Sequence, residues 1–576
     1  EYDRDTERTR VIIPYPEMMY GKGPKDLRYR ANWNTPVALS PHDPSVIYYG
    51  TQFVLKSTDR GASWTAISPD LTRNDPEKQG RNGGPLTPEN VGAEFYNTIF
   101  YIVESPHEAG TLWVGSDDGL VHITRDGGAN WQNVSPPHRG KFSDEAYINA
   151  IEISPHDPAT AYLAVQGHKL NDFSPYVYRT TDYGQRWQRI DKGLPADTFV
   201  RVVREDPARK GLLYAGTEAG LFVSFNDGGD WEALKLNLPP VPITDLTIRQ
   251  DSLVAATQGR AYWVLDDLFV VRQAAAGDVA GGALRLFEPG TVAMVRGEGG
   301  RPDNFEGANP QPGVPLYYYF DEEPEGPLTI EILDGAGQVI RTWSSEETDF
   351  DRCLLANMDM RRPFELKFPT TAKGLNKWTW DLRRDGVHCI EDIQLHAGFG
   401  GATVAPGAYR ARVSAGGRSA EAGFALVPDP RSSATPAQLT EWTARLDETA
   451  SLLDEILRRL GEAREARGQV EALLAGHPDD ADLQQAGKAA VEAITTWDRK
   501  LNQHLHQTYE DEDAWETMLA GQVRYLLDVI DYSGAPVTGG QLERLGDLQA
   551  EWSERRRELQ AIREEHIATI NAWARE

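Results

Sequence analysis

Six acidic residues stand at positions where a carboxylate could act as a catalytic acid or base. Hydrolysis of a glycosidic bond needs two such groups, one protonated and one ionised, on either side of the bond. The chain holds 87 acidic residues, however, so such pairs also arise by chance. Asp117-Asp118-Gly119 is typical of a turn between strands, and Asp266-Asp267 follows a strand end. We assign no catalytic residue and keep six hypotheses: Glu94, Asp117, Asp118, Asp172, Asp266 and Asp267.

Motifs of other catalytic chemistries are absent from the sequence. There is no Gly-x-Ser-x-Gly elbow, His-Glu-x-x-His pair, P-loop or dinucleotide-binding fingerprint. The histidines are scattered, and His42, His107 and His156 recur in one repeated turn. We therefore predict neither a metal site nor a cofactor.

One insertion interrupts an otherwise regular pattern. The stretch GHKLNDFSPY (167–176) lengthens a single loop and brings His168, Asp172 and Tyr176 together in sequence. Loops carry binding residues more often than the scaffold does. These three residues are our prediction for a contact surface, and plain loop packing is the alternative.

A short stretch ending in Trp occurs four times, and we call its copies the Asp–Gly–Trp turns. They read STDRGASW (57–64), TRDGGANW (124–131), TTDYGQRW (180–187) and SFNDGGDW (224–231). The acidic or amide side chain can accept turn amides, the glycine can take positive φ, and the indole can cover the turn. Four copies cannot share one catalytic centre, so we predict structural roles for Asp59, Gly61, Trp64, Asp126, Gly128, Trp131, Asp182, Gly184, Trp187, Asn226, Gly228 and Trp231.

These turns belong to a longer repeat that covers residues 33–285. Each copy has three or four short runs rich in Val, Ile, Leu and Tyr, and the fifth copy lacks the closing turn. A repeat of small antiparallel sheets is typical of β-propeller blades, which must stack on neighbours to bury both faces. We predict about five blades.

The remaining segments predict a mainly β protein with a C-terminal α domain. Residues 1–32 form an extension with one strand, RVIIPY (10–15). Alternating runs over 286–430 indicate an antiparallel β-sandwich of the immunoglobulin or fibronectin type. Capping boxes at Thr435 and Thr538, followed by leucines at helical spacing, indicate an antiparallel helical bundle over 435–576.

Composition restricts the partners and the compartment. The formal net charge of −28 argues against nucleic acid and against anionic membrane surfaces. No run of 18 apolar residues indicates a membrane span. Cys353 and Cys389 lie 36 positions apart; a disulfide is expected in an exported protein, and two buried thiols are the alternative. Because the sequence begins at Glu1, we expect a processed chain or a fragment.

The order of these elements resembles a group of large bacterial exported proteins, described as sortilin-like or as BNR-repeat, glycosyl hydrolase-like propellers. In them the Asp–Gly–Trp turns are known as Asp-boxes. The resemblance covers nearly the whole chain and rests on these stretches: SPHDPSVIYYGT (40–51), KSTDRGASWTAISPDLTRND (56–75), YVYRTTDYGQRW (176–187), GRAYWVLDD (259–267), GLNKWTWDLR (374–383) and APGAYRARV (405–413).

The chain departs from that group in two respects. Members carry further blades before the point where this chain starts, so a separate chain, a cleaved N-terminal half or a second copy is expected to complete the ring. A closed ring of five blades is the alternative. Gln258 stands where members often carry His, which weakens any role for that position.

The sequence therefore supports three hypotheses. The first is an exported, non-catalytic binding or assembly protein with a protein partner or self-assembly. The second is a glycoside hydrolase whose cleft includes the missing blades. The third is capture of peptides in the propeller channel, as in sortilins. A glycan or a peptide is the expected ligand class.

Overall fold

The computed structural model describes residues 1–573, apart from 85, 88–89, 91–93, 138–143, 276–283, 296–308, 358–365, 394, 396–397, 507–510 and 512. The chain divides into two compact units, Glu1–Ala276 and Gly277–Glu576, which we describe separately. Among the described residues, no helix combines the length and the apolar character that crossing a membrane requires.

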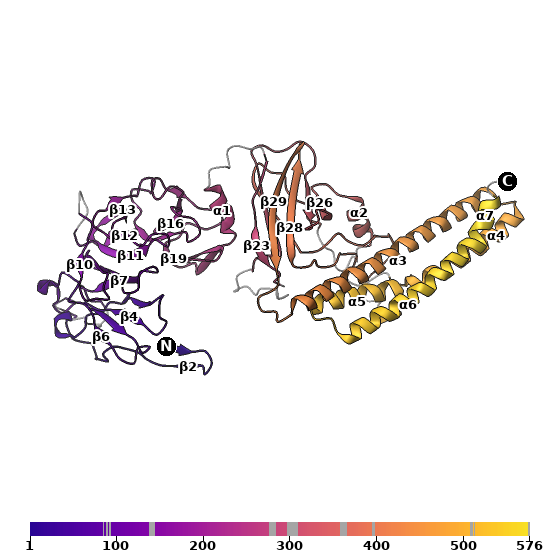
Figure 1. The fold of residues 1–576 in the computed structure, drawn as a ribbon. Helices are drawn as coiled ribbons and strands as arrows, with labels where there is room; N and C mark the ends of the chain where they lie inside the picture. Colours follow the sequence, from indigo (N-terminus) through magenta and orange to yellow (C-terminus); the bar gives the residue numbers. More distant parts are fainter. Residues whose placement is uncertain are drawn as a thin grey trace. The chain divides into compact units, whose positions relative to one another are not determined.

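Unit 1 contains five small antiparallel sheets, which we call blades 1 to 5 (Figure 1). In blades 1 to 4, each strand pairs with the next one along the chain. The strands of blades 1 and 2 are β3 (Val37–Leu39), β4 (Ile47–Gly50), β5 (Val54–Ser57), β6 (Thr65–Ala66), β7 (Ile99–Glu104), β8 (Leu112–Ser116), β9 (Val121–Thr124) and β10 (Gln132–Asn133).

Blades 3 and 4 repeat this order, whereas blade 5 has three strands followed by a short helix. Their elements are β11 (Tyr147–Ile153), β12 (Ala161–Gly167), β13 (Asp172–Thr180), β14 (Gln188–Arg189), β15 (Val200–Glu205), β16 (Leu213–Thr217), β17 (Gly220–Ser224), β18 (Glu232–Ala233), β19 (Ile243–Arg249), β20 (Ser252–Thr257), β21 (Tyr262–Leu265) and α1 (Leu268–Ala274). This is a β-propeller-like arrangement.

In blades 2 to 4 the second strand is buried on both faces, because a neighbouring blade packs on each side. All five residues of β8 and of β16 are buried. Glycine makes the close approach possible: a β-carbon at Gly115 would lie 2.5 Å from Ile148 of blade 3. Gly216 meets Ile243 of blade 5 in the same way, at 2.7 Å.

The Asp–Gly–Trp turns share one hydrogen-bonding pattern. In the first, Ser57 Oγ donates to Asp59 Oδ1 at 2.8 Å, and the amides of Gly61 and Ser63 donate to Ser57 Oγ and Asp59 Oδ1. The same three bonds recur in the other copies, with Asn226 replacing the aspartate in blade 4. Bonds donated by Ser63 and Ser57 lower the pKa of Asp59 to about 2.

In blades 2 to 4 the turn also fastens its blade to the preceding one. The indole Nε1 atoms of Trp131, Trp187 and Trp231 donate to the carbonyls of Ile67, Val134 and Ile190, at 2.9, 2.7 and 2.6 Å. These carbonyls follow the outer strand of the blade before. The side chains of Ile67, Val134 and Ile190 also press against the turn glycines Gly128, Gly184 and Gly228, respectively.

A second contact joins successive blades at their first turn. Nε2 of His42, His107 and His156 lies 2.8, 2.9 and 2.8 Å from the carbonyl oxygens of Ser105, Ser154 and Asp206 in the next blade. The repeated turn that contains His42, His107 and His156 is thus an interblade contact. Among the described residues, consecutive blades pack extensively, whereas the strands of blades 5 and 1 do not. The five blades form an open arc.

The N-terminal segment corrects one sequence prediction. Residues 10–15 contain no strand; instead β1 (Tyr2–Asp3) pairs with β2 (Arg8–Thr9) in a small hairpin. The backbone of Arg10 exchanges hydrogen bonds with Glu1, and no third-strand partner continues the pairing beyond it among the described residues. Pro14 and Pro16, which lack amide donors, end the run.

Unit 2 begins with two sheets that share one apolar core. The three-stranded sheet contains β22 (Leu284–Leu286), β24 (Val314–Phe320) and β27 (Gly374–Trp380). The five-stranded sheet contains β23 (Gly290–Ala293), β29 (Arg418–Val427), β28 (Gly407–Ala415), β25 (Thr329–Leu333) and β26 (Val339–Ser344), in that order. An immunoglobulin-like topology stays a prediction.

Two details of the predicted sandwich are wrong. The boundary at 285/286 cuts through β22, whose Leu286 pairs with Tyr318 of β24. The sheet is also not wholly antiparallel, because β23 pairs in parallel with β29. A disulfide joins Cys353, in α2 (Asp349–Ala356), to Cys389.

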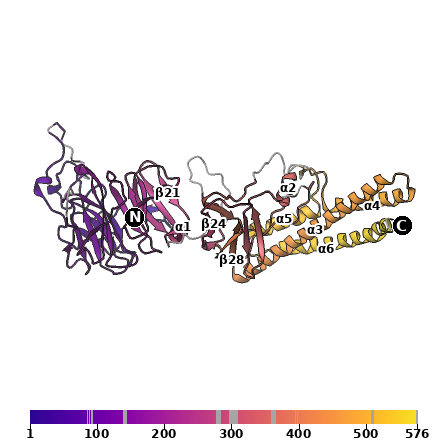
Figure 2. The same ribbon diagram turned by 90° about the horizontal axis from the view of Figure 1, so that it is seen from above.

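The C-terminal helices form a bundle (Figure 2). They are α3 (Pro436–Gly476), α4 (Ala481–Leu501), α5 (Leu519–Ser533), α6 (Gly539–Ile562) and α7 (Ala568–Trp573), with a π-helical turn (Arg563–Ile567) before α7. The predicted capping boxes are present: Thr435 and Gln438 begin α3, and Thr538 and Gln541 begin α6.

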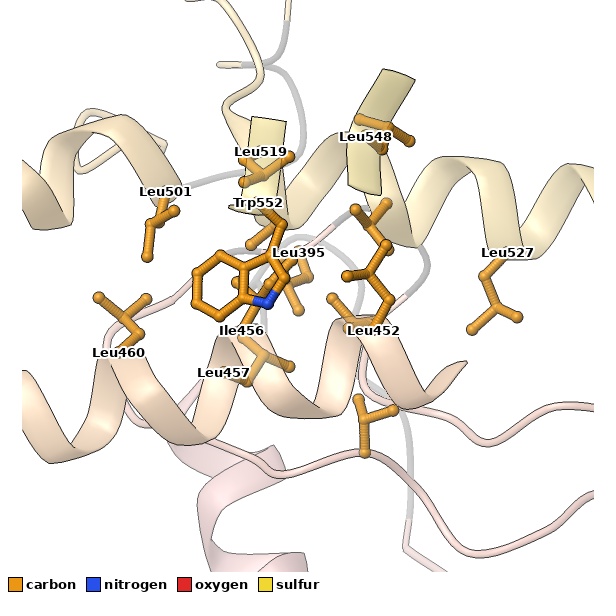
Figure 3. Close-up of a cluster of buried hydrophobic side chains, with 14 of the residues drawn as sticks. Leu395, Leu452, Ile456, Leu457, Leu460, Leu501, Leu519, Leu527, Leu548 and Trp552 are labelled. Atoms are coloured by element: carbon orange, nitrogen blue, oxygen red, sulfur yellow. The ribbon is translucent and has the colours of Figure 1, made fainter. Parts of the chain in front are cut away.

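The bundle core extends into the segment that leads away from the disulfide. Leu457 and Leu460 of α3 lie near Trp552 of α6, with Leu395 beside them (Figure 3). The indole of Trp552 donates to Glu455 at 3.1 Å, and that of Trp442 donates to the Ile530 carbonyl at 2.9 Å. The helices therefore share one core with Val387, Ile393, Leu395, Phe399 and Ala402.

The interblade contact predicts a measurable difference between two glycines. Gly184 and Gly127 both have positive φ, +84° and +73°, but a β-carbon would meet Val134 at 2.8 Å only at Gly184. Gly184→Ala should destabilise the protein by about 2–4 kcal/mol, from backbone strain and overpacking together. Gly127→Ala should cost about 1 kcal/mol, from backbone strain alone. Urea unfolding of both variants checks this, and equal losses would contradict the packing role.

Candidate functional site

The blades have two unequal ends. Within a blade, the turns joining strands 1 and 2 and strands 3 and 4 lie at one end, which we call the turn end. The hairpins joining strands 2 and 3 and the links between blades lie at the other, the link end. The repeated interblade contacts occupy the turn end. The link end carries irregular loops, and loops hold binding residues more often than the scaffold does.

A buried polar network lies between blades 1 and 2 at the link end. Arg30 Nη2 pairs with Asp70 at 2.6 Å, and Arg30 Nε donates to the Asn97 carbonyl at 3.1 Å. Asn97 Nδ2 and the Arg73 amide both donate to Asp118 Oδ2 at 2.7 Å. These buried groups satisfy one another, so the network fixes the loops rather than offering free groups to a ligand.

Asp117 is the hypothesised carboxylate with the most unusual environment. It follows the second strand of blade 2, and its two oxygens accept from the amide and the hydroxyl of Thr98 at 2.9 and 2.7 Å. Burial raises the pKa of Asp117 to about 7, although the bonds from Thr98 oppose this. Because both oxygens are engaged, the geometry indicates a role in holding the link between blades.

The other hypothesised carboxylates also have structural partners. Glu94 is 3.4 Å from the Trp33 indole nitrogen, and Asp266 accepts from the Ser252 hydroxyl at 3.1 Å. Asp267 precedes α1 with φ +61°. Asp172 accepts from the Tyr176 hydroxyl at 2.5 Å. None of these contacts pairs two facing carboxylates.

An aromatic cluster is the feature of the link end best suited to a ligand. We call Tyr147, His168, Phe173 and Phe199 the aromatic platform. His168 stacks on Phe199 with centroids 4.5 Å apart and planes at 12°. Phe173 and Tyr147 lie 6.3 Å from Phe199 and 5.7 Å from His168, respectively. Phe173 is 47% exposed, so the platform has an apolar face open to solvent.

The inserted loop explains how the platform forms. It extends β12 and β13 beyond the neighbouring hairpins, and His168–Leu170 makes a 3-10 turn at its tip. This turn brings His168 against Phe199, which precedes the first strand of blade 4. The prediction placed His168 in the contact loop, but Asp172 and Tyr176 form a separate pair. Phe173 and Phe199 were missed because their proximity depends on packing between blades.

Charged groups surround the platform. The Lys169 ammonium lies 4.9 Å from the Tyr147 ring, and the Arg201 guanidinium lies 5.2 Å from that of Phe199. Arg201 also pairs with Glu218 at 2.6 Å. Burial, with Lys169 and Arg201 nearby, lowers the pKa of His168. The imidazole is therefore neutral at pH 7 and can stack as an aromatic ring.

A separate charge cluster links the inner strands of four blades. Arg204 Nη2 lies 3.3 Å from the Tyr101 hydroxyl and 2.8 Å from Asp245, and Nη1 lies 3.5 Å from Glu152. Burial raises the pKa of Glu152 to about 7, against the opposing effect of Arg204. This cluster joins strands of blades 2 to 5. Across the described parts of the chain, no group of three or more His, Cys, Asp or Glu could hold a metal ion.

Two cavities in the described part of unit 2 have volumes of about 490 and 450 Å³. The first lies between the sandwich and the helices, where Arg383 pairs with Asp531 at 2.8 Å. The second is lined by Trp343 and Trp378, whose rings are 5.9 Å apart. Both belong to the packing of unit 2, and the aromatic platform remains the stronger candidate.

The fold and the platform define a β-propeller-like protein with an aromatic surface at one end. No protein-family model matches the chain. In sequence it is 28% identical, over 116 residues, to a probable oligoxyloglucan-reducing end-specific xyloglucanase of Neosartorya fischeri; the match covers 20% of this chain and 14% of that protein. It is 26% identical over 174 residues to the corresponding xyloglucanase of Emericella nidulans, covering 28% and 18%.

Solved structures give a similar picture. The chain is similar to a GH74 xyloglucanase from Xanthomonas campestris, with 20% identity and a TM-score of 0.31 over 40% of this chain and 36% of that one. This chain spans less than a fifth of the length of the two fungal relatives. The sequence comparisons thus show weak similarity to xyloglucanases over a small part of the chain.

The raised pKa of Asp117 predicts a pH effect on stability. Between pH 4 and 7 the folded protein keeps a proton on Asp117 that the unfolded chain, with a pKa of 3.8, has lost. The free energy of unfolding should therefore fall as pH rises through this window, by at most about 1.4 kcal/mol per pH unit from this group. Asp117→Asn cannot titrate, so the difference between wild type and variant should change over the window.

Urea unfolding at several pH values measures this difference. Asp126→Asn is the matched control in the same blade, because the pKa of Asp126 is lowered to about 2 by bonds from Asn130. Its difference from wild type should stay flat between pH 5 and 7. A flat difference for Asp117→Asn would contradict the assigned protonation.

Proposed function

We propose that the chain is part of a glycoside hydrolase-like β-propeller and that the aromatic platform binds a polysaccharide such as xyloglucan. The observation that carries this proposal is the partly exposed stack of His168, Phe199 and Phe173 at the link end. The weak sequence similarity to xyloglucanases supports the choice of ligand class. It favours the glycoside hydrolase hypothesis over a purely non-catalytic assembly protein.

The platform has the chemistry that sugar recognition requires. A sugar ring presents an apolar face of C–H groups and a rim of hydroxyls. Phe173 offers an exposed ring face, Lys169 offers a donor over the Tyr147 ring, and Glu218, paired with Arg201, offers an acceptor. Apolar surface combined with a few placed polar groups is the usual composition of a ligand site. The neutral state of His168 keeps the stack free of an added charge.

Hydrolysis needs a facing pair of carboxylates, and the hydrogen bonds described for the hypothesised carboxylates engage other groups. Asp117 has the raised pKa of a general acid, but Thr98 occupies both of its oxygens. We therefore assign glycan binding to this arc and place the catalytic pair in a cleft completed by further blades. Among the contacts of the described residues, none favours the hypothesis of peptide capture.

We further propose that the protein is exported. The disulfide between Cys353 and Cys389 closes a loop of 36 positions and would persist in an oxidising compartment. A polysaccharide ligand also lies outside the cell. Fractionation of cells that produce the protein tests this proposal, with recovery from the cytosolic fraction alone as the contrary result.

Binding is tested by affinity electrophoresis and calorimetry of the whole chain with xyloglucan and its oligosaccharides. Phe173→Ala removes the exposed ring and should weaken binding roughly tenfold, which corresponds to about 1.4 kcal/mol. Phe225→Ala is the matched control, since Phe225 is 39% exposed but lies at the turn end of blade 4. Its affinity should equal that of wild type.

Two outcomes would contradict the proposal. One is the absence of binding to xyloglucan and to a panel of other polysaccharides. The other is an equal loss of affinity in Phe173→Ala and Phe225→Ala. Release of reducing ends, measured on the same samples, separates binding from hydrolysis, and we expect none from this arc alone.

A further inference from the structure

One face of blade 1 lacks the cover that the corresponding faces of the inner blades receive. Val37 of β3 pairs with Tyr49 in blade 1. Ile102, Ile151 and Val203 occupy the equivalent paired positions in blades 2, 3 and 4. Val37 is 57% exposed, whereas the other three are 5%, 0% and 1% exposed. Leu39 is 66% exposed, whereas its equivalents Glu104, Ile153 and Glu205 are 6%, 5% and 2% exposed. In blades 2 to 4 the preceding blade covers these positions.

The N-terminal hairpin occupies the place of the outer edge of a preceding blade. A β-carbon at Gly61 would meet Ile12 at 2.8 Å, as one at Gly184 would meet Val134. The pairing agrees as well. Glu1 pairs with Arg10 two residues before Ile12, just as Lys56 pairs with Thr65 two residues before Ile67. The number of residues between the paired positions is the same.

The equivalence extends to hydrogen bonds. In blades 2 to 4 the indole donates to the carbonyl of the residue that presses on the turn glycine. In blade 1 that residue is Ile12, yet the buried Trp64 Nε1 has no hydrogen-bond partner among the described residues. A buried donor without a partner costs free energy, so this indole marks an incomplete contact.

We infer that residues 1–13 are the outer edge of a sixth blade, which we call blade 0. The rest of blade 0, which we call its occupant, is a three-stranded antiparallel unit of the same repeat type. Its third strand continues the pairing of Glu1 with Arg10. It would cover Val37 and Leu39 and fix the Ile12 carbonyl for Trp64. By the repeated contact, its first turn would carry a histidine that reaches the Ser40 carbonyl.

The occupant is identified by three features on one surface: apolar side chains at interblade positions, a hairpin in outer-strand register and an unpartnered indole. A glycan would not cover valine and leucine on a sheet face. An unpaired sheet edge also tends to recruit another strand. This inference concerns blade packing and does not depend on the proposed ligand.

A graft tests the inference directly. Residues 144–178 contain the corresponding inner strands of blade 3 and end one position before Arg179, the equivalent of Glu1. Placed before Glu1, they should raise the melting temperature of the chain by at least about 4 °C. Val37→Asp should abolish this gain in the grafted chain but change the ungrafted chain little, because Val37 is exposed there.

A second measurement needs no graft. In the ungrafted chain, Trp131→Phe removes the bond to Ile67 and should lower the melting temperature by about 2–4 °C. Trp64→Phe should change it by less than about 1 °C, because its indole has no acceptor. Equal losses would overturn the inference, as would a graft that gives no gain or a gain that survives Val37→Asp.

The molecular mass of the ungrafted protein in solution tests the competing possibility that a second copy of the chain covers this face. A monomer agrees with the inference. A dimer that Val37→Asp dissociates would show that a second copy covers this face, which would overturn the assignment of a blade 0 unit. If the protein binds no polysaccharide, the proposed function fails, but the expected melting temperatures and molecular mass stay the same.

Discussion

The arrangement of unit 1 depends on one interaction: an indole of one blade donating to a main-chain carbonyl of the blade before it. Trp187 shows why the surrounding residues are needed. Its indole reaches the Val134 carbonyl, the Val134 side chain presses on Gly184, and Thr180 and Asp182 hold the turn that presents both groups. A small sheet cannot bury two faces alone, so each blade depends on its neighbours. The repeated Asp–Gly–Trp turn is the sequence pattern that supplies this contact between blades.

This dependence separates the two ends of the blades. The turn end is committed to contacts between blades, so its carboxylates are engaged and those of Asp59 and Asp126 have pKa values near 2. The link end carries irregular loops, and there the inserted loop within residues 167–176 brings His168 onto Phe199. The same end holds Asp117, whose raised pKa reflects burial in a link rather than catalysis. A ligand surface on a rigid frame is the result.

Local patterns allowed much of the fold to be predicted. The Asp–Gly–Trp turns, the repeated turns of His42, His107 and His156, and the capping box at Thr435 each involve only a few consecutive residues. The structure contains these turns and the cap where the sequence predicted them. Contacts between distant segments were not predictable in this way. Phe199 joins His168 only through packing of blades 3 and 4, and the parallel pairing of β23 with β29 has no local signal. The N-terminal hairpin carries Thr9 where a blade would carry Trp, which hid its register.

Hydrogen–deuterium exchange of the isolated chain tests the central claim most directly, because protection reports the local free energy of opening. Blade 3 has neighbours on both sides, whereas blade 1 has a complete neighbour on one side only. We predict that the amides of β4 and β5 exchange clearly faster than those of β12 and β13. Equal protection of the two blades would contradict the account, since it would show that a blade does not need both neighbours.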